Sequence, residues 1–383
     1  MILGWFSTLC LAMAGLGCLY LVTAAVLVGR FARSGTPSPA LFPSVTILKP
    51  LHGDEPGLFE NLASFCAQDY SGPVQIVFGV QDPADPAVAV VKRLAAAFPD
   101  KALDLVIEAR LQGANRKVAN LINMAPSIRH EAVVLADSDM RVPPDYLVRV
   151  VAALQHPGVG LVTCLYHGVP VSDQLWPRLS ALAIDTHFLP NVIVGLSLGL
   201  ARPCFGSTIA LRRTTLDDID GFAAFADLLA DDYAIGAAVR AAGHAVAIPP
   251  FTVGHSCPEN SAQALWRHEV RWARTIRSVD PAGYAGLAIT HAFPLGLLGA
   301  LAGRPGALIV AAAAVACRIA LCMRIERAFG LQRHPRWLVP LRDLLSFAVF
   351  VWSFFGLAVS WKGSDYRVKS DGTLLSERRS PVP

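Results

Sequence analysis

Two acidic sites follow short apolar runs that have the character of buried strands. Asp82 stands two residues after the run 74–80, and Asp137 and Asp139, separated by a serine, come directly after the run 132–136. Two carboxylates at the end of a strand suit a hard divalent cation such as Mg²⁺ or Mn²⁺, which prefers carboxylate and phosphate oxygens. An aspartate-rich turn is the alternative, because Asp and Ser are also turn formers.

Two further polar groups stand at the starts of predicted helices. Lys117 follows Asn115 and an arginine just before a helical segment. Backbone N–H groups and a lysine there suit an anion such as a pyrophosphate, with a solvated helix cap as the alternative. Asp231 and Asp232 precede the helical segment 234–242. A carboxylate in that place is either a catalytic base or an ordinary capping group.

Aromatic and basic residues alternate at helical spacing in the segment 266–277, WRHEVRWARTIR. Arg271 there is suited to binding a phosphate through two hydrogen bonds, and Trp272 to a membrane interface; a solvated amphipathic helix is the alternative. Upstream, Gly206 would allow a close backbone approach to a bound group, although a plain turn explains it equally well. His255 is more typical of a structural histidine than of a catalytic one.

These residues lie in a middle region where short apolar runs alternate with helical periodicity. Strands are predicted at 44–48, 74–80, 103–107 and 132–136. Helices are predicted at 86–98, 117–129, 234–242 and 266–277. The alternation predicts an α/β fold with a parallel sheet, helices on both faces and ligands at the carboxyl ends of the strands.

The composition places part of the chain in a membrane. Of 383 residues, 54% are hydrophobic and 16% are charged, against roughly 25% charged in soluble domains. Residues 1–29 carry no charge and are followed by Arg30 and Arg33, which predicts an uncleaved anchor with its carboxyl end in the cytoplasm and a linker over 30–43.

The net charge of +4 is too small and scattered for a nucleic-acid binder. The eight cysteines contain no CxxC pair, which argues against a zinc ribbon.

Apolar character returns near the end of the chain. Three membrane segments are predicted at 284–303, 305–323 and 344–361, which together make a membrane region over 284–361. The basic loop 324–342 is expected in the cytoplasm. The positive charge of the tail 362–383 favours the cytoplasm too, whereas three simple crossings would place the tail on the opposite side, so its side stays open. The stretch 189–201 is short for a span and is either buried core or a membrane-lying segment.

As an ordered set, these motifs resemble the ceramide glucosyltransferase family of membrane glycosyltransferases, including the bacterial branch that glycosylates hopanoid lipids. The matching pieces between residues 45 and 277 are VTILKPLHGDEPGLFENLASFCAQDY, FGVQDPADPA, NRKVANL, DSDMRV, ADDY and RHEVRW. The resemblance implies a nucleotide-sugar-binding fold of the GT-A type over 44–280, on the cytoplasmic side of a bacterial inner membrane. It also implies inverting transfer of a hexose from UDP-glucose or UDP-N-acetylglucosamine to the hydroxyl of a ceramide or hopanoid in the bilayer.

The resemblance also implies roles for single residues. Asp232 matches the general base, Asp82 the aspartate that meets the nucleoside, and Asp139, more directly than Asp137, the ligand of Mg²⁺ or Mn²⁺. Donor binding is implied for Asp82, Asp137, Asp139, Lys117, Arg271 and Trp272, the last two as the pair of the (Gln/Arg)-x-x-Arg-Trp motif. His268 stands where that motif has Gln or Arg. Further candidates to line the site are Gly206, Asp231, His255 and His268.

Three other functions compete with this interpretation. A processive polysaccharide synthase shares the fold and the Arg-Trp motif but would need more membrane helices than are predicted. A lipid esterase would use Ser197 in a G-x-S-x-G motif, which requires a strand before the serine and a helix after it. A non-enzymatic transporter or scaffold would keep polar residues within its membrane segments, whereas the charged motifs here lie between them.

Overall fold

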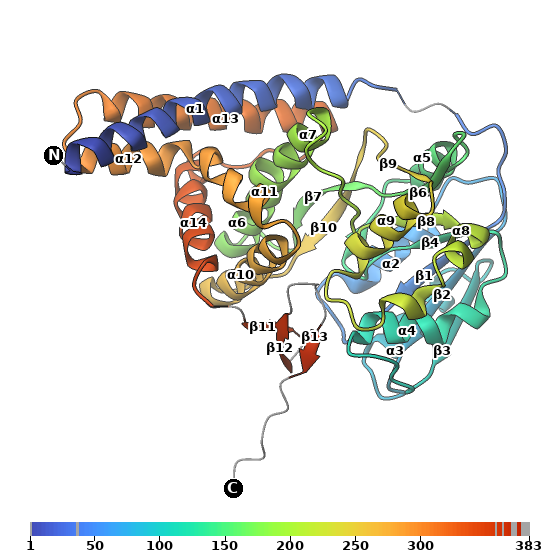
Figure 1. Ribbon diagram of the computed structural model, residues 1–383. Coiled ribbons are helices and arrows are strands. Elements are labelled where there is room, and N and C mark those ends of the chain that lie inside the picture. Colours follow the sequence, from blue (N-terminus) through green and yellow to red (C-terminus); the bar gives the residue numbers. More distant parts are fainter. Residues whose placement is uncertain (1, 36–37, 357, 362–363, 369–373, 377–383) are drawn as a thin grey trace, which may run out of the picture. The chain divides into compact units, whose positions relative to one another are not determined.

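The computed structural model describes residues 2–35, 38–356, 358–361, 364–368 and 374–376. The chain divides into two compact units, labelled by their elements in Figure 1. The helical unit contains residues 1–34, 167–202 and 259–361, and the sheet unit contains residues 35–166, 203–258 and 362–383. Most of the basic tail, including Lys362 and Lys369, lies outside the described residues.

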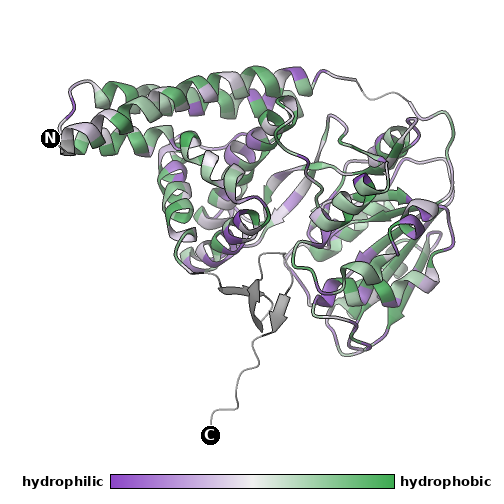
Figure 2. Ribbon diagram, in the orientation of Figure 1, coloured by the Kyte–Doolittle hydropathy of each residue, from purple (hydrophilic) through white to green (hydrophobic). Residues whose placement is uncertain are grey.

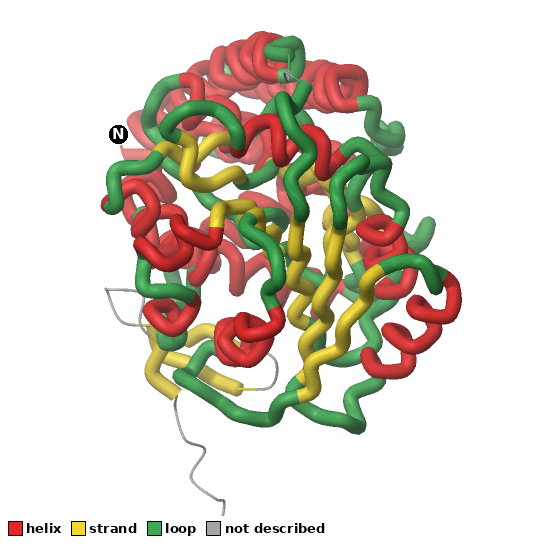
Figure 3. Tube along the Cα trace, turned by 90° about the vertical axis from the view of Figure 1, so that its right-hand side faces the viewer, coloured by secondary structure: helices red, strands yellow, loops and turns green. Residues whose placement is uncertain are grey.

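A seven-stranded sheet in the order β3-β2-β1-β4-β8-β6-β9 forms the centre of the sheet unit, and its strands are drawn in yellow in Figure 3. β1 pairs in parallel with both β2 and β4, and β2 pairs in parallel with β3. β8 runs antiparallel to β4 and β6, which the sequence did not predict. The strands are β1 (Val45–Pro50), β2 (Val74–Val80), β3 (Ala102–Ile107), β4 (Ala132–Leu135), β6 (Val159–Val162), β8 (Ile209–Arg212) and β9 (Ala245–Ala247).

Helices join these strands as the alternating pattern predicts. The helix predicted over 117–129 ends earlier, at Met124, and continues only as the 3-10 turn η1 (Ala125–Ser127), because Pro126 has no N–H to extend the helix. The helices are α2 (Leu58–Cys66), α3 (Ala87–Ala97), α4 (Arg116–Met124), α5 (Tyr146–Leu154), α8 (Arg213–Asp218), η3 (Phe222–Phe225) and α9 (Asp231–Ala241). The remaining strands of this unit are β5 (Met140–Arg141), β10 (Thr252–Cys257), β12 (Ser364–Val368) and β13 (Leu374–Ser376), while β7 (Leu165–Pro170) runs across the boundary between the units.

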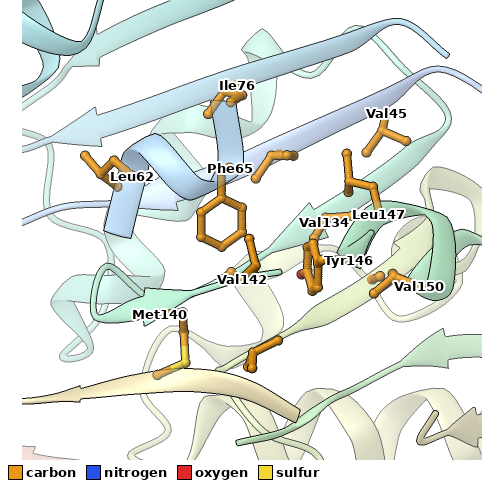
Figure 4. Packing of buried hydrophobic residues seen from close by; sticks show 14 of the residues in the cluster. Val45, Leu62, Phe65, Ile76, Val134, Met140, Val142, Tyr146, Leu147 and Val150 are labelled. Atoms are coloured by element: carbon orange, nitrogen blue, oxygen red, sulfur yellow. The ribbon is translucent and has the colours of Figure 1, made fainter. Parts of the chain in front are cut away.

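The sheet has one hydrophobic core on each face. Ile47 and Val134 belong to the core under α2 and α5, where Phe65 and Tyr146 meet edge to face with ring centroids 5.7 Å apart (Figure 4). Their neighbour Leu48 belongs to the opposite core, under α4 and α9. Successive side chains of a strand point to opposite faces, so two buried faces require the nearly unbroken apolar runs seen in the sequence.

The helical unit holds the apolar segments, which appear as long green stretches in Figure 2. Three described helices are long and apolar enough to cross a membrane, spanning Gly4–Phe31, Leu175–Ser197 and Ala307–Phe329; the bent pair Pro281–Thr290 and Ala292–Leu301 is a fourth span if it counts as one. The helices are α1 (Ile2–Phe31), α6 (Leu175–Ala183), η2 (Ile184–Phe188), α7 (Leu189–Ser197), α10 (Ala262–Val279), α11 (Pro281–Gly286), η4 (Leu287–Thr290), α12 (Ala292–Leu301), α13 (Ala307–Phe329) and α14 (Leu338–Ser353), followed by strand β11 (Ala358–Trp361).

α1 and α13 run in the same direction. Phe31 and Phe329, near their carboxyl ends, have ring centroids 6.4 Å apart. Near the start of α1, the Ser7 hydroxyl donates to the carbonyl of Gly299 in α12, 3.1 Å away. Basic residues follow α1 and also follow the apolar part of α13. Because the two helices run in the same direction, these basic residues lie at the same end of the helix pair. The positive charge of both segments predicts this shared end.

Three apolar segments differ from their predictions. The stretch 189–201 is not an isolated short segment, because its helix continues α6 through the π-helical turn η2 into one stretch of 23 residues. The segment 284–303 is not straight but is bent by 64° at His291. The segment 344–361 is not one helix: α14 ends at Ser353, and Gly356 follows with a φ of 91°, a left-handed conformation that stops a helix.

Arg318, in the middle of α13, connects the two helix breaks of the helical unit. Its guanidinium is fully buried and donates to the carbonyls of Thr186, inside η2, at 2.7 Å and of Thr290, at the bend, at 2.5 Å. The Asp343 carboxylate of α14 lies 3.1 Å from Arg318 Nε and also pairs with His187. Carbonyls freed by a helix break must be satisfied inside an apolar bundle, and one arginine satisfies both.

Replacing Arg318 with methionine should therefore destabilise the helical unit by about 3–5 kcal/mol, because it removes the donor to two buried carbonyls and the arginine that pairs with the buried Asp343 carboxylate. Thermal unfolding of the protein in detergent measures the loss. The control is Arg327→Met, since Arg327 is exposed in the last turn of the same helix and should melt like wild type. Equal melting curves for both variants would mean that Arg318 does not hold the breaks.

Candidate active site

The predicted acidic residues follow parallel strands at one edge of the sheet. Chain order reverses between β1 and β4, since β2 and β3 lie on one side of β1 and β4 on the other. Open α/β sheets bind ligands at the carboxyl ends of the strands beside such a switch point. Asp137 and Asp139 follow β4 there, and Asp82 follows β2.

The loop of residues 137–139, called the DSD loop below, contains two aspartates with different surroundings. Asp137 Oδ1 accepts from the ammonium of Lys117 at 2.8 Å. Asp139 Oδ2 lies 3.5 Å from Nδ1 of His255, which reaches the loop from β10. Asp139 Oδ1 is shielded from solvent and has no hydrogen-bond partner among the described residues. The resemblance implied Asp139 more directly than Asp137 as the ligand of a cation, and in the structure only Asp137 of the two pairs with a lysine.

Lys117 joins the DSD loop to the start of α9. Its ammonium contacts Asp137 at 2.8 Å and Asp231 at 3.0 Å. Burial alone would lower the pKa of Lys117, but the carboxylates of Asp137, Asp231 and Asp232 outweigh burial and hold that pKa well above its usual value. Lys117 is therefore a permanent cation at the centre of an acidic cluster.

The start of α4 is closed by its own cap. Asn115 accepts the N–H groups of Lys117 at 3.0 Å and Val118 at 3.2 Å, and its amide donates to Asp231 at 3.3 Å. Two of the backbone donors that the sequence offered to a pyrophosphate are thus already used by this cap. The charge of Lys117 still favours an anion near this helix.

Gly206 is the backbone link between the loop and Asp232. Its N–H donates to Asp232 Oδ2 at 2.9 Å, and its carbonyl accepts from the N–H of Asp137 at 3.1 Å. A Cβ built on Gly206 would lie 2.4 Å from Asp137 Oδ2 and 3.0 Å from Lys117 Nζ. This close approach requires glycine, so the structure brings Gly206, Asp137, Lys117, Asp231 and Asp232 together.

Asp232 is a carboxylate adjusted toward proton transfer near neutrality. Burial, and then the negative charge of Asp231, raise the pKa of Asp232 to about 6, although Lys117 and the N–H groups of Tyr233 and Gly206 oppose the rise. A group with a pKa near the working pH serves well as a general base. The resemblance implied this residue as the general base, and the raised pKa of its carboxyl is compatible with that role.

The hydrogen bond that the Asp82 side chain makes is local to its own turn and does not involve the acidic cluster. Its side chain is exposed, and Oδ1 accepts from the N–H of Ala84 at 2.8 Å, which shapes the turn after β2. The buried carboxylate of this turn is Asp85, which accepts from the N–H groups of Gly53 at 2.9 Å and Ala87 at 2.8 Å. Asp85 ties the loop after β1 to α3, a structural role that the sequence did not indicate.

His268, Arg271 and Trp272 lie on α10 in the helical unit. His268 Nδ1 pairs with the buried carboxylate of Glu259, and the edge of the His268 ring meets Trp272 with ring centroids 4.5 Å apart. The histidine at the first motif position is thus held by a glutamate that sequence reasoning missed. The trace of this pair in the sequence is the presence of Glu259 nine residues before His268.

Much of the basic face predicted on α10 makes contacts within the helical unit. Arg274 donates to the carbonyl of Phe355 at 2.6 Å, and Arg277 donates to that of Gly356 at 3.0 Å, where α14 has ended. Both arginines therefore hold the backbone of the segment that follows α14.

Two expectations about other chemistry are resolved by local structure. Ser197 is the last residue of the helix α7, and the elements directly before α7 are helical, so Ser197 does not form the strand-turn-helix elbow of an esterase. Among the described residues, no group of three His, Cys, Asp or Glu side chains is placed to hold a metal ion by itself. A cation at Asp139 would have to take further ligands from a bound molecule.

Comparison with known proteins agrees with the motifs and the fold. The ceramide glucosyltransferase 1 of Caenorhabditis elegans is 25% identical over 234 residues, which cover 61% of this chain and 48% of that protein. The ceramide glucosyltransferase 3 of the same organism is 24% identical over 266 residues, which cover 67% of this chain and 55% of that protein. The chain thus spans about half the length of the curated relatives it matches.

A solved structure matches nearly the whole fold. The mannosyltransferase PcManGT from Pyrobaculum calidifontis, solved with GDP-Man and Mn²⁺, aligns with a TM-score of 0.52 and 23% identity over 92% of this chain and 99% of that one. This likeness identifies the sheet unit as a GT-A fold. The model of glycosyl transferase family 21 matches residues 8–374, and the chain therefore belongs to that family.

Proposed function

We propose that this protein transfers a hexose from a UDP-sugar to the hydroxyl of a membrane lipid, with inversion at the anomeric carbon. The observation that carries the proposal is the cluster at the switch point of the sheet. In this cluster Asp232, a carboxylate with a raised pKa, is linked to the DSD loop by two hydrogen bonds of Gly206, one to Asp232 and one to Asp137. Nucleotide-sugar chemistry needs both functions, a base for the acceptor and a site for the diphosphate.

The proposed chemistry starts at the acceptor hydroxyl. A neutral alcohol is a poor nucleophile, and Asp232 would take its proton as the oxygen attacks the anomeric carbon from the face opposite the diphosphate. The bond from that carbon to the diphosphate oxygen breaks, and UDP leaves with added negative charge. Lys117 would stabilise this charge, and we assign Arg271 and Trp272 to the same donor by the motif they match.

The residues around Asp139 fit a divalent cation. A buried carboxylate oxygen without a partner, beside His255, offers ligands of the type that Mg²⁺ and Mn²⁺ accept, and the rest would come from the diphosphate. When bound, the cation would neutralise charge on the leaving diphosphate. Asp137, paired with Lys117, would orient the loop rather than bind the cation.

The family and the apolar helices support a membrane lipid as the acceptor. Ceramide and a hopanoid of the bacteriohopanetetrol type are equally compatible with the residues, as are UDP-glucose and UDP-N-acetylglucosamine. An active site on the cytoplasmic face of a bacterial inner membrane would meet both the soluble donor and the embedded lipid. The exposed Asp82 would contact the nucleoside.

The direct test is to incubate purified protein with a panel of UDP-sugars and lipid acceptors, with and without chelator, and to identify products by mass. A single hexose on a ceramide or hopanoid, lost with chelator, is the expected product. A polymer would favour the processive synthase, and the absence of any transfer from the panel would contradict the proposal. Transfer that survives chelation would remove the cation from the mechanism.

The pKa of Asp232 predicts a specific pH profile. A base must be deprotonated to act, so kcat/KM should fall about tenfold for each pH unit below about 6 and be level above that pH. Rates measured from pH 5 to 8, with saturating metal, give the profile. A level profile through pH 6 would show that Asp232 is not the group that accepts the proton.

A further inference from the structure

Lys49 is a charged residue in the middle of the sheet. It lies near the end of β1, between β2 and β4, and its side chain is fully buried. A buried charge is costly unless polar groups surround it. The question is therefore what this lysine does that an apolar strand residue would not.

The Lys49 ammonium is held by a backbone carbonyl and an aromatic ring. Nζ donates to the carbonyl of Asp137 at 2.5 Å and lies 3.9 Å from the centroid of the Phe65 ring. Burial lowers the pKa of Lys49 to about 7, although the charges of Asp137, Asp139 and Glu55 oppose the fall. Because no part of Lys49 is exposed, it is not placed to bind a donor phosphate directly.

The other two carbonyls of the DSD loop are also held from within the protein. The Asn61 amide donates to the carbonyl of Ser138 at 3.4 Å, and the N–H of Ser256 donates to that of Asp139 at 2.9 Å. Ser256 and Asn61 are themselves hydrogen bonded at 3.1 Å. Each carbonyl from residue 137 to residue 139 thus has a partner on a different element, β1, α2 or β10.

We propose that Lys49 is a positioning residue for the DSD loop. Its ammonium anchors the Asp137 carbonyl and so keeps the Asp139 carboxylate where a cation bound with UDP would need it. The proposal rests on the function proposed above. Groups that orient a metal ligand without touching the metal usually change its affinity by about 10–100-fold when removed. Lys49 has this relation to Asp139 through two peptide bonds.

The test measures binding rather than turnover. Mn²⁺ uptake in the presence of UDP, followed by the electron paramagnetic resonance signal of free Mn²⁺, compares the wild-type full chain in detergent with Lys49→Met and Lys49→Gln. We expect Lys49→Met to bind Mn²⁺ about 10–100-fold more weakly. Lys49→Gln keeps a shorter N–H donor and should lose less. The control Lys92→Met changes an exposed lysine of α3 and should bind like wild type.

The outcomes separate the two proposals. A folded Lys49 variant, judged by its melting curve, that binds Mn²⁺ within about twofold of wild type would overturn the role of Lys49 alone, since removal of an orienting group should cost more. If Lys49→Met does not fold, Lys49→Gln decides by the same criterion. A wild-type protein that takes up no Mn²⁺ with UDP would overturn both this role and the cation step of the proposed function.

Discussion

Replacing Asp232 with asparagine should lower the rate of sugar transfer by about 10²–10⁴-fold, the usual contribution of a general base. Asparagine keeps the shape of the side chain and can still accept the Gly206 N–H, which is now 2.9 Å from Asp232 Oδ2. Binding of the UDP-sugar should therefore stay close to wild type. Steady-state transfer rates and calorimetric titration with UDP-sugar measure the two quantities separately.

The matched control for this substitution is Asp217→Asn, because Asp217 is an exposed aspartate of α8 on the same unit. It should leave both rate and binding unchanged. A rate for Asp232→Asn near that of wild type would remove Asp232 from the mechanism. Parallel loss of donor binding would instead mean that Asp232 supports the fold of the donor site.

Replacing Asp139 with asparagine should lower the transfer rate by about 10²-fold or more, because a cation that stabilises leaving-group charge contributes several kcal/mol. The loss should appear first as weaker binding of Mn²⁺ in the presence of UDP. Asp137→Asn provides the comparison. Since Asp137 pairs with Lys117 at 2.8 Å, its loss should disturb transfer while weakening Mn²⁺ binding less than the Asp139 change does.

The order of these two effects is what the different environments of the aspartates predict. If Asp137→Asn weakened Mn²⁺ binding as much as Asp139→Asn, both carboxylates would have to leave their present partners when donor binds. If neither substitution changed Mn²⁺ binding, the loop would not be a cation site.

The sequence predicted the sheet well because buried parallel strands leave a strong trace. The run 74–80 coincides with β2, and the acidic residues after β2 and β4 lie at the strand ends where they were expected. Both depend on local patterns, namely apolar runs and the polar residue that ends them. The antiparallel β8 lacked such a trace, since its direction depends on the path of the chain between 163 and 208.

The pairing of charges inside the site could not be predicted in the same way. Lys117 pairs with both Asp137 and Asp231, and the second of these contacts joins residues more than 100 positions apart. Lys49 left only a weak signal, a single lysine in an apolar strand. Its purpose becomes visible only when β4 places the Asp137 carbonyl 2.5 Å from its ammonium.

The apolar segments were found by composition, but their breaks were not. Hydropathy averages over a window and so hides Gly356, whose left-handed conformation ends the helical path after α14. It also gave no sign that Arg318 would connect the π-helical turn η2 with the bend at His291. Helix breaks of this kind depend on a partner from another helix.

The most direct test of the central claim is an experimental structure of the full chain with UDP and Mn²⁺. The account predicts that Mn²⁺ is bound by the Asp139 carboxylate and by diphosphate oxygens, with Asp232 facing the side where the sugar would be attached. Nucleotide bound away from the carboxyl ends of β1 and β4, or Mn²⁺ bound without Asp139, would contradict it.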